Sequence, residues 1–414
     1  MIRGLVADGP YQLLLILAAL LLVIELTALA WRHPTFALWL FSGGAVLSAY
    51  NWTVGVTVAG VQAYPLDLAA VVAAGATLGN LRSGVRLPRA AVALGALVIF
   101  AGLRGIAEFG LQQSVNSARS LLYVVVATVF AATCLPHGLD SLRRVWMVMS
   151  LIFLATALAF WAQHGLGSYA ATGERALNSA QALVVAHAGF LSLTRLQSRW
   201  ARPFAGLCLV AVLASQQRTV WASVAVSALV ITLLPALRSH RQLAQFARRG
   251  LALGIAAAAV LLVVNPSGVR DSATYAADIS ADQGTLGWRV TGWQGLLDDY
   301  GSAGPVDQLV GQPSGTGFAR ALRGSIETAS PHNMYVFTLL STGLLGLLAL
   351  LVLYARTAAL ARMSNPLAFA LVIGVVVFSV GYQLAPEQGL LLGVVLATTP
   401  SRPSSDQREL EAAR

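Results

Sequence analysis

Long apolar runs separated by short polar segments occupy most of the chain. Most of these runs exceed the ~10 residues of a membrane barrel strand and do not alternate polar with apolar positions, so they predict membrane-spanning helices. The predicted spans are residues 11–31, 35–50, 64–80, 89–106, 117–136, 142–163, 178–196, 202–215, 218–236, 249–266, 333–356, 366–383 and 387–398. The last run is short and fits a re-entrant segment. We therefore expect an all-α integral membrane protein with twelve or thirteen transmembrane helices.

The composition agrees with this pattern. Hydrophobic residues make up 57% of the 414 residues and charged residues only 11%, whereas soluble proteins carry about 25% charged residues. The first run, Tyr11 to Trp31, is long and lacks the small-residue cleavage site of a secretory signal, so we interpret it as a retained span. Cys134 and Cys208 lie in or beside apolar runs and indicate neither a disulfide framework nor a metal site.

The net charge of +10 comes from arginine, because the chain contains no lysine. The arginines are scattered through short loops rather than gathered in one patch, which disfavours nucleic-acid binding. Arginine-rich short loops mark the cytoplasmic side. The rule therefore places four loops on the external side of the membrane, near Glu108 and at 165–173, 216–217 and 267–331. The sidedness of the first two spans stays open, since Arg3 and the later loops favour opposite answers.

One polar segment, residues 267–331, is much longer than any other loop, and long loops are commonly functional. Within it, residues 287–300 have helical apolar spacing and predict an amphipathic helix on the membrane surface. The glycine-rich piece 311–320 predicts turns followed by a short helix. The chain thus divides into a membrane domain of about ten helices, an external loop with short helices, the last helices and a disordered cytoplasmic tail. Their boundaries are 1–266, 267–331, 332–399 and 400–414.

Three residues are the main candidates for chemistry: Arg218 and His332 at span edges, and Arg289 within the long loop. Arg218 starts a span after a very short external turn, where it is either an anchor at the helix end or part of a recessed polar pocket. His332, with Asn333, opens the next span after the long loop; the pair is either a helix cap or a group facing a reaction. A neutral imidazole can accept a proton from a sugar hydroxyl.

Arg289, flanked by Trp288 and Trp293, is either an interfacial anchor or a phosphate clamp. The planar guanidinium binds phosphate oxygens through charge-assisted hydrogen bonds. Weaker candidates are three charges near span edges, Arg104, Arg119 and Asp67. No nucleotide-binding loop, paired-aspartate metal motif, zinc-protease motif or nucleophile elbow is present in the sequence.

Three features of the chain stand together. An arginine heads a late span, and the external loop has an R…W element followed by G-T-G-F. An H-N pair then opens the next span before L-L-S-T-G-L-L-G-L-L. In these features the chain resembles the O-antigen ligase and polymerase family. The specific resemblance covers residues 210–350. Family members often have Ser-x-Ser-Arg before the first arginine, where this chain has Ser215-Gln216-Gln217-Arg218. Met334 and Tyr335 also replace a commoner small residue after the H-N pair.

The resemblance implies a metal-independent, cofactor-free glycosyltransferase of the inner membrane. It implies that glycan moves from a polyprenyl diphosphate carrier to an acceptor hydroxyl outside, with inversion. Arg218 and Arg289 would hold the diphosphate, and His332 would orient or deprotonate the acceptor. The remaining expected substrate contacts are Asn333, Arg119, Gly315 and Gly317. The expected partners are the lipid-linked donor, a glycan or lipid acceptor, membrane lipids and a chain-length regulator, but no nucleic acid.

Several alternatives remain open at this level. The acceptor can be a lipid core, another lipid-linked repeat or a protein. A large C-terminal soluble domain would favour a protein acceptor, and we do not find one in the sequence. A transporter or flippase would have a similar helix count, but we find no matching halves of the kind transporters show. A peptidoglycan polymerase of similar topology would instead depend on a loop aspartate, Asp298 or Asp299.

Overall fold

The computed structural model describes most of the chain. The described residues are 10–49, 56–58, 61–81, 87–135, 138–164, 175–194, 199–234, 245, 248–249, 285–322 and 325–397. Nearly all of the tenth predicted span, the start of the long loop and the predicted tail lie outside these residues.

The described part is predominantly helical, as predicted. Its helices are α1 (Pro10–Arg32), α2 (Pro34–Ala49), α3 (Pro65–Leu81), α4 (Arg89–Phe109), α5 (Leu111–Cys134), α6 (Gly138–His164), α8 (Ser179–Ser192), α9 (Ala201–Ala214), α10 (Arg218–Leu233), α13 (Thr285–Ser302), α14 (Pro305–Val310), α15 (Met334–Ser364), α16 (Pro366–Gly381) and α17 (Pro386–Ala397). Several begin with proline, which suits a first helical turn because its missing N–H has no partner there. Each predicted span within the described residues coincides with one of these helices.

Four helices, α4, α5, α6 and α15, are long and apolar enough to cross a membrane. Others, among them α3, α10 and α16, are equally apolar but have only 10–17 residues. The described helices therefore indicate a multi-pass membrane protein, while the count of twelve or thirteen crossings stays a prediction.

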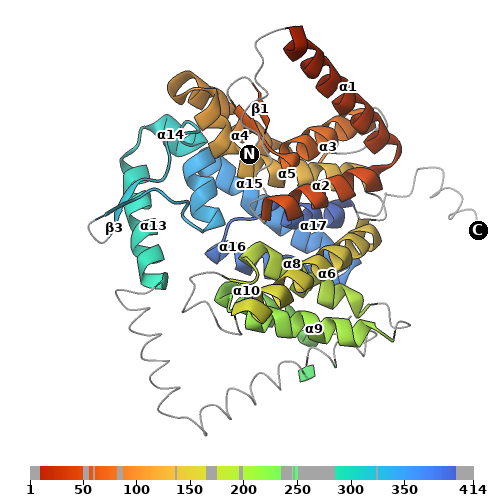
Figure 1. Cartoon of the computed structure of the whole chain (residues 1–414). Coiled ribbons are helices and arrows are strands. Elements are labelled where there is room, and N and C mark those ends of the chain that lie inside the picture. The colour runs from red at the N-terminus through yellow and green to blue at the C-terminus, as the bar shows by residue number, and fades with distance from the viewer. Residues whose placement is uncertain are drawn as a thin grey trace, which may run out of the picture.

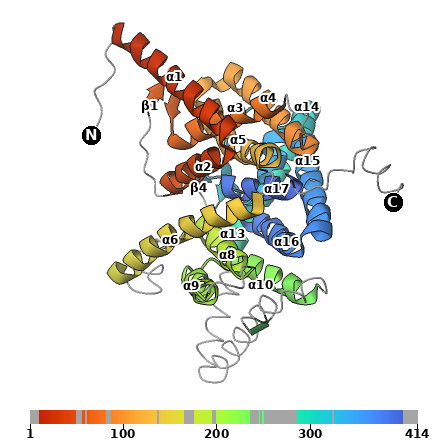
Figure 2. The ribbon, with the colours of Figure 1, turned by 90° about the vertical axis from the view of Figure 1, so that its right-hand side faces the viewer.

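The helices form a bundle in which α17 lies at the centre (Figure 1; Figure 2). Every residue of α17 from Pro386 to Val395 is buried. Two glycines let it approach α5 closely: a Cβ at Gly389 would lie 3.1 Å from that of Ala127, and one at Gly393 2.7 Å from that of Ala131. Small residues at such contacts are typical of helix packing in membranes. With 12 residues, α17 is about 18 Å long, shorter than a ~30 Å hydrocarbon core.

Two short antiparallel hairpins were not predicted. The first joins β1 (Val56–Val58) to β2 (Val61–Ala63), and the second joins β3 (Arg320–Leu322) to β4 (Ser325–Glu327). The second hairpin stands where we expected a short helix after the glycine-rich piece, so that prediction is wrong.

The physical reason is the backbone of the glycine-rich piece. Gly311, Gly315 and Gly317 all have positive φ and cannot initiate a right-handed helix. Arg320 then donates to the carbonyls of Phe318 (2.9 Å) and Ala329 (2.6 Å), which ties the two ends of the hairpin together. The short helix of this region, α14, comes before the glycines instead.

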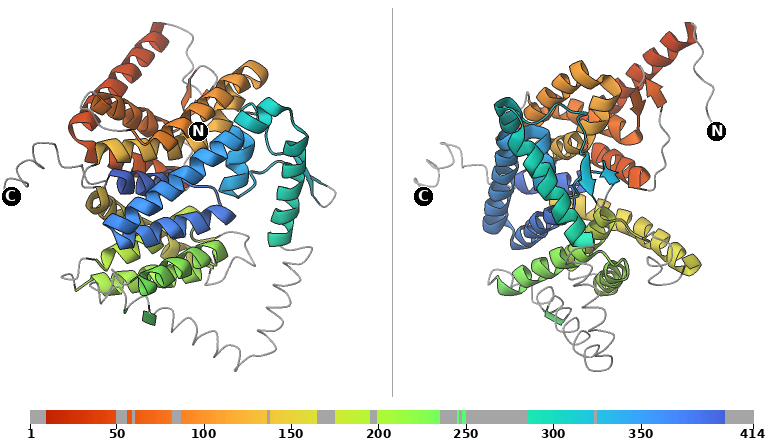
Figure 3. Two further views of the ribbon diagram at one scale, coloured as in Figure 1. Left: turned by 180° about the vertical axis from the view of Figure 1, so that it is seen from behind. Right: turned by 90° about the vertical axis from the view of Figure 1, so that its left-hand side faces the viewer.

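The predicted amphipathic helix is present as α13, which lies beside the bundle (Figure 3). Its Leu296 is buried against Val336 and Leu340 of α15, with Trp293 and Tyr300 packed around them. The apolar side of α13, which the sequence predicted, therefore packs against the start of α15. Placement of this helix at a membrane surface stays a prediction.

The segment after α14 is clamped between α4 and α15 by backbone contacts. Gln312 N–H donates to the Leu340 carbonyl and Ser314 N–H to the Ala101 carbonyl, each at 2.9 Å. Helix α15 is interrupted at Gly343 (φ 66°, ψ −170°), where a side chain would meet the backbone of the incoming segment. Glycine is needed here both for its conformation and for the close approach.

A mutation in α4 tests this clamp. Gly105 faces the Ser314 carbonyl, and a Cβ there would also lie 2.8 Å from Ser114 Oγ. We expect Gly105→Ala to lower the free energy of unfolding by about 1–3 kcal/mol through overpacking. The measurement is thermal or denaturant unfolding of purified protein in detergent.

The matched control is Gly102→Ala, one turn away on the same helix, where a Cβ would meet nothing within 4 Å. That variant should be neutral or up to ~1 kcal/mol more stable, because alanine favours the helix. Equal stability of the two variants would contradict the clamp.

Candidate active site

The H-N pair forms the entrance to α15. Asn333 caps this helix, since its Oδ1 accepts from the N–H groups of Tyr335 (2.9 Å) and Val336 (3.0 Å). His332, just before it, has φ 49°, a left-handed conformation that is rare outside glycine. The cap interpretation is correct for Asn333. The His332 side chain takes no part in this cap. Strained backbone of this kind is concentrated at functional sites.

The chain around His332 is held by the loop and by the end of α16. Trp293 Nε1 donates to the Pro331 carbonyl at 2.5 Å, and Gln383 donates to the Ser330 hydroxyl. These bonds fix the two residues before His332, and the cap made by Asn333 fixes the residue after it, so the backbone that carries the imidazole is held on both sides.

Tyr382, directly after α16, joins His332 to Arg289. The Arg289 guanidinium carbon lies 5.1 Å from the centre of the Tyr382 ring, and the His332 ring stands edge-on to the same ring at 6.4 Å. Arg289 Nη1 also donates to the Gly381 carbonyl at 3.1 Å. Its Nε is buried without a hydrogen-bond partner among the described residues. The structure therefore brings together two of the three main candidates.

Arg218 is placed differently from Arg289. It occupies the first position of α10 and is exposed, and within the described part of the chain no hydrogen bond or ion pair of its side chain is recorded. Its neighbours contact the same turn: Gln217 Oε1 accepts from the Tyr382 hydroxyl at 2.9 Å, and Thr219 packs on Gly381. The start of α10 thus borders the Tyr382 cluster, with the Arg218 side chain open to ligand.

Two further arginines adjoin this cluster, and the sequence interpretation missed both. Arg175 Nη1 donates to Gln217 Oε1 at 2.9 Å. Arg320 is buried, and its guanidinium lies over the Trp288 ring at 5.7 Å. The positive-inside rule disfavours arginine in external loops, and both arginines lie in loops that we predicted to be external. That exception was the sequence signal by which they could have been found. Tyr382 and Gln217 carried no comparable signal.

The electrostatics of the cluster keep the His332 imidazole neutral. Burial lowers the pKa of His332 below its ordinary value, and the positive charges of Arg289 and Arg320 lower it further, while Glu327 acts in the opposite direction. A neutral imidazole is the form that can accept a proton.

Arg119, by contrast, belongs to a separate cluster. Its Nε lies 3.2 Å from Asp67 Oδ1, its Nη2 donates to the Gln62 carbonyl, and its guanidinium covers the Tyr64 ring at 4.7 Å. These contacts join α5 to β2 and α3, so the structure does not place Arg119 with His332 and Arg289. Arg104 is likewise engaged, in a 2.6 Å ion pair with Asp307 of α14.

The two candidate glycines differ from each other. Gly315 is buried against the Phe109 ring, and its carbonyl accepts from Gln113 Nε2 at 2.6 Å. Gly317 is exposed, and a Cβ there would meet nothing within 4 Å. Gly315 thus fixes the loop, while Gly317 is open to a ligand. Among the described residues no three His, Cys, Asp or Glu side chains gather as metal ligands.

Comparison with known proteins gives one family match. Residues 203–351 match the family model of O-antigen ligase. The matched region is a minority of the 414 residues, but it runs from α9 into α15 and includes Arg218, Arg289 and His332. No curated protein matches the chain significantly.

Proposed function

The match over residues 203–351 supports assignment of this chain to the O-antigen ligase and polymerase family, and from that premise we propose its reaction. The protein transfers a glycan from a polyprenyl diphosphate carrier to an acceptor hydroxyl at the outer face of the inner membrane. The observation that carries this proposal is the shared contact of His332 and Arg289 with Tyr382. A base and a fixed positive charge in one place are what displacement of a diphosphate requires.

In the proposed step, the acceptor oxygen attacks the anomeric carbon of the donor sugar from the face opposite the leaving group. A new C–O bond forms as the bond from that carbon to the diphosphate oxygen breaks, and its electron pair leaves with the polyprenyl diphosphate. The hydroxyl proton passes to the His332 imidazole. The configuration at the anomeric carbon is inverted.

Fixed positive charge stabilises the departing diphosphate in this proposal. Arg289 is preorganised, because both the Gly381 carbonyl and the Tyr382 ring hold its guanidinium. Arg218, exposed at the adjacent start of α10, completes the clamp when the carrier binds. Positioned charges of this kind act mainly on the transition state, where the leaving group becomes most negative.

The test of the proposed function uses purified protein with a lipid-linked oligosaccharide. Release of polyprenyl diphosphate, together with a glycan-extended acceptor, supports the proposal. A protein that moves the lipid-linked oligosaccharide across a vesicle bilayer but leaves it intact would instead be a flippase.

The pH dependence gives a further prediction. Because His332 must be neutral to accept a proton, kcat/KM should fall with acid only below the ordinary histidine pKa of about 6.5. The negative charge of Glu327 favours the imidazolium form of His332, so removing that charge lowers the pKa of His332 further. We therefore expect Glu327→Gln to move the acid limb of the kcat/KM profile to lower pH.

Glutamine at position 327 can still accept the hydrogen bond that Glu327 Oε1 receives from Ala329 N–H at 3.0 Å. The control is Glu108→Gln, at the exposed end of α4, which should leave the limb in place. A limb that moves to higher pH in Glu327→Gln would contradict the proposed role of the neutral imidazole.

A further inference from the structure

One glutamine beside the proposed site has no role in the mechanism above. Gln217 is only 2% exposed and lies directly before Arg218, in the turn that leads into α10. Its side chain does not cap that helix. The amide instead extends to the Tyr382 cluster, where it makes hydrogen bonds with three other residues.

Both ends of this amide are used. Gln217 Oε1 accepts from the Tyr382 hydroxyl and from Arg175 Nη1, each at 2.9 Å. Its Nε2 donates to the Leu177 carbonyl at 3.1 Å. These contacts fit only one orientation of the amide, because a guanidinium can only donate and a carbonyl can only accept. The amide therefore joins the segment before α8, the start of α10 and the end of α16.

The position of the Tyr382 ring depends on this amide. Tyr382 follows the last residue of α16, so the helix does not fix its side chain. Phe378 stacks on the ring with centres 5.3 Å apart, and Gln217 holds the hydroxyl end. The Arg289 guanidinium and the His332 ring contact the same ring. A shift of the ring would therefore disturb both groups that we assign to the chemistry.

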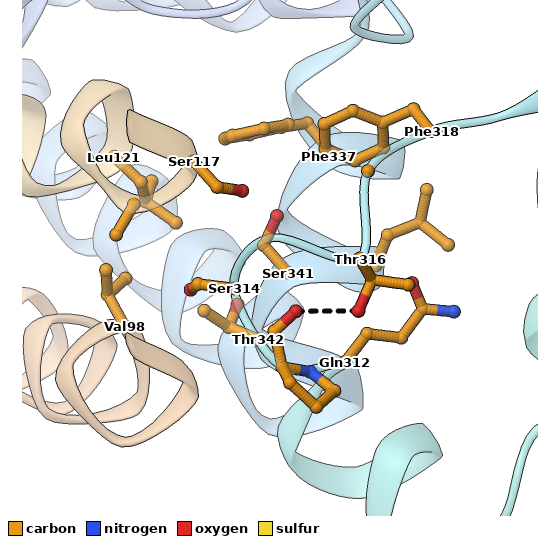
Figure 4. A pocket seen from close by; sticks show the side chains of 14 residues that line it. Val98, Ser117, Leu121, Gln312, Ser314, Thr316, Phe318, Phe337, Ser341 and Thr342 are labelled. Carbon is orange, nitrogen blue, oxygen red and sulfur yellow. Dashed lines mark hydrogen bonds between the residues drawn. The ribbon is translucent and has the colours of Figure 1, made fainter. Parts of the chain in front are cut away.

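The backbone after His332 is held by tight packing. Phe337 N–H donates to the Asn333 carbonyl at 2.9 Å in the first turn of α15. The Phe337 ring lies next to that of Phe318, with ring centres 5.5 Å apart (Figure 4). The pocket that these rings line has a volume of about 20 Å³, room for about one water molecule. The Tyr382 side, where one amide holds the ring, is thus where a single substitution can disturb the site.

A neutral amide suits this position chemically. A carboxylate at position 217 would accept the same two hydrogen bonds, but it would place a negative charge beside Arg218, which the proposed function assigns to the diphosphate. Methionine has a similar length, but it has no donor and only a weak acceptor. Gln217→Met therefore removes the hydrogen bonds while it largely fills the same space.

We propose that Gln217 is a positioning residue that acts through the Tyr382 hydroxyl. It holds the Tyr382 ring, and with it the Arg289 guanidinium and the His332 imidazole, in the arrangement that the reaction uses. The inference rests on the proposed function for the reaction itself. The arrangement of the two groups can be measured without turnover.

The first test measures the pKa of His332 by NMR, with labelled histidine in protein held in lipid nanodiscs. The chain has six histidines, and His332→Asn identifies the His332 signal by its loss. Burial and the charges of Arg289 and Arg320 lower this pKa, and Glu327 raises it. We expect Gln217→Met to move the pKa up toward the ordinary value of about 6.5, because the Arg289 charge is no longer held near the imidazole.

Tyr382→Phe keeps the ring and removes only the hydroxyl, so it should move the pKa of His332 in the same direction. The Gln217→Met/Tyr382→Phe double variant should move it no further than the larger single shift, because both changes remove the same hydrogen bond. The matched control is Gln216→Asn, at an exposed position whose φ of 55° asparagine tolerates. The control should leave the pKa unchanged.

Kinetics then connect this arrangement to the reaction. Misplacement of a group by about 1 Å can lower a rate by roughly a hundredfold. Gln217→Met should therefore lower kcat roughly tenfold to a hundredfold, with a smaller change in the donor KM. Gln216→Asn should leave both constants unchanged.

An unchanged pKa of His332 in Gln217→Met and Tyr382→Phe would overturn the proposal, and Tyr382→Phe alone carries this test if Gln217→Met does not fold. An equal shift in Gln216→Asn would overturn it too, because the turn rather than the buried amide would be responsible. So would a shifted pKa with a normal kcat. The expected pKa shifts in a protein that releases no polyprenyl diphosphate would keep the arrangement set by Gln217 and overturn the proposed function instead.

Discussion

Replacing His332 by asparagine should reduce turnover of lipid-linked glycan about a hundredfold to ten-thousandfold, the usual effect of losing a general base. Asparagine is the informative substitution, because His332 has a positive φ of 49° that asparagine tolerates better than most residues. The imidazole is lost while the entrance to α15 keeps its conformation. The measurement is release of polyprenyl diphosphate by purified protein.

Two further variants are measured alongside His332→Asn. His332→Ala should lose as much activity and also some stability, since alanine disfavours the left-handed backbone. His33→Asn changes an exposed histidine between α1 and α2 and should leave turnover unchanged. Near-normal turnover of a folded His332→Asn protein would remove the base from the mechanism.

Replacing Arg289 by alanine should lower kcat roughly a hundredfold to a thousandfold, as expected when one preorganised donor to a developing charge is removed. The structure explains why this arginine should matter so much. Its guanidinium is fixed by the Gly381 carbonyl at 3.1 Å and by the Tyr382 ring, so little reorganisation is needed when the diphosphate departs. The readout is kcat measured with saturating donor.

Lysine at position 289 discriminates charge from geometry. Arg289→Lys keeps the charge but loses the planar fork, so it should recover only part of the lost rate. The control is Arg356→Ala, an exposed arginine toward the other end of α15, which should behave like the unmodified protein. If Arg289→Ala changes only the donor KM, the guanidinium binds the carrier equally in the ground state and transition state.

Much of the fold could be predicted from the sequence, because helix formation in an apolar environment is a local property. A lipid-facing backbone must satisfy its hydrogen bonds within the helix, so a long apolar run is sufficient evidence for one. The helix α13 was predicted by a second local signal, the helical spacing of apolar residues over 287–300. The hairpin at 320–327 was missed because it depends on contacts of Arg320 with carbonyls several residues away.

The candidate site was only partly predictable. Two of its chemistry-bearing residues could be found: His332 because an imidazole at the start of an apolar run is conspicuous, and Arg289 because it stands between two tryptophans in the long loop. Arg119 is equally conspicuous, yet the structure pairs it with Asp67 in a separate cluster. Type and position along the chain do not reveal which charge has an internal partner.

The sequence by itself therefore determined a helical membrane protein, the order of its helices, an arginine and a histidine at the starts of two late predicted spans, and a further arginine in the long loop. Only the tertiary structure decided that Tyr382 stands between His332 and Arg289. It alone showed that Gln217, 165 residues away, accepts the hydrogen bond of that tyrosine. The reason is physical: hydropathy acts residue by residue along the chain, whereas a site is made by packing that brings distant segments within a few ångströms.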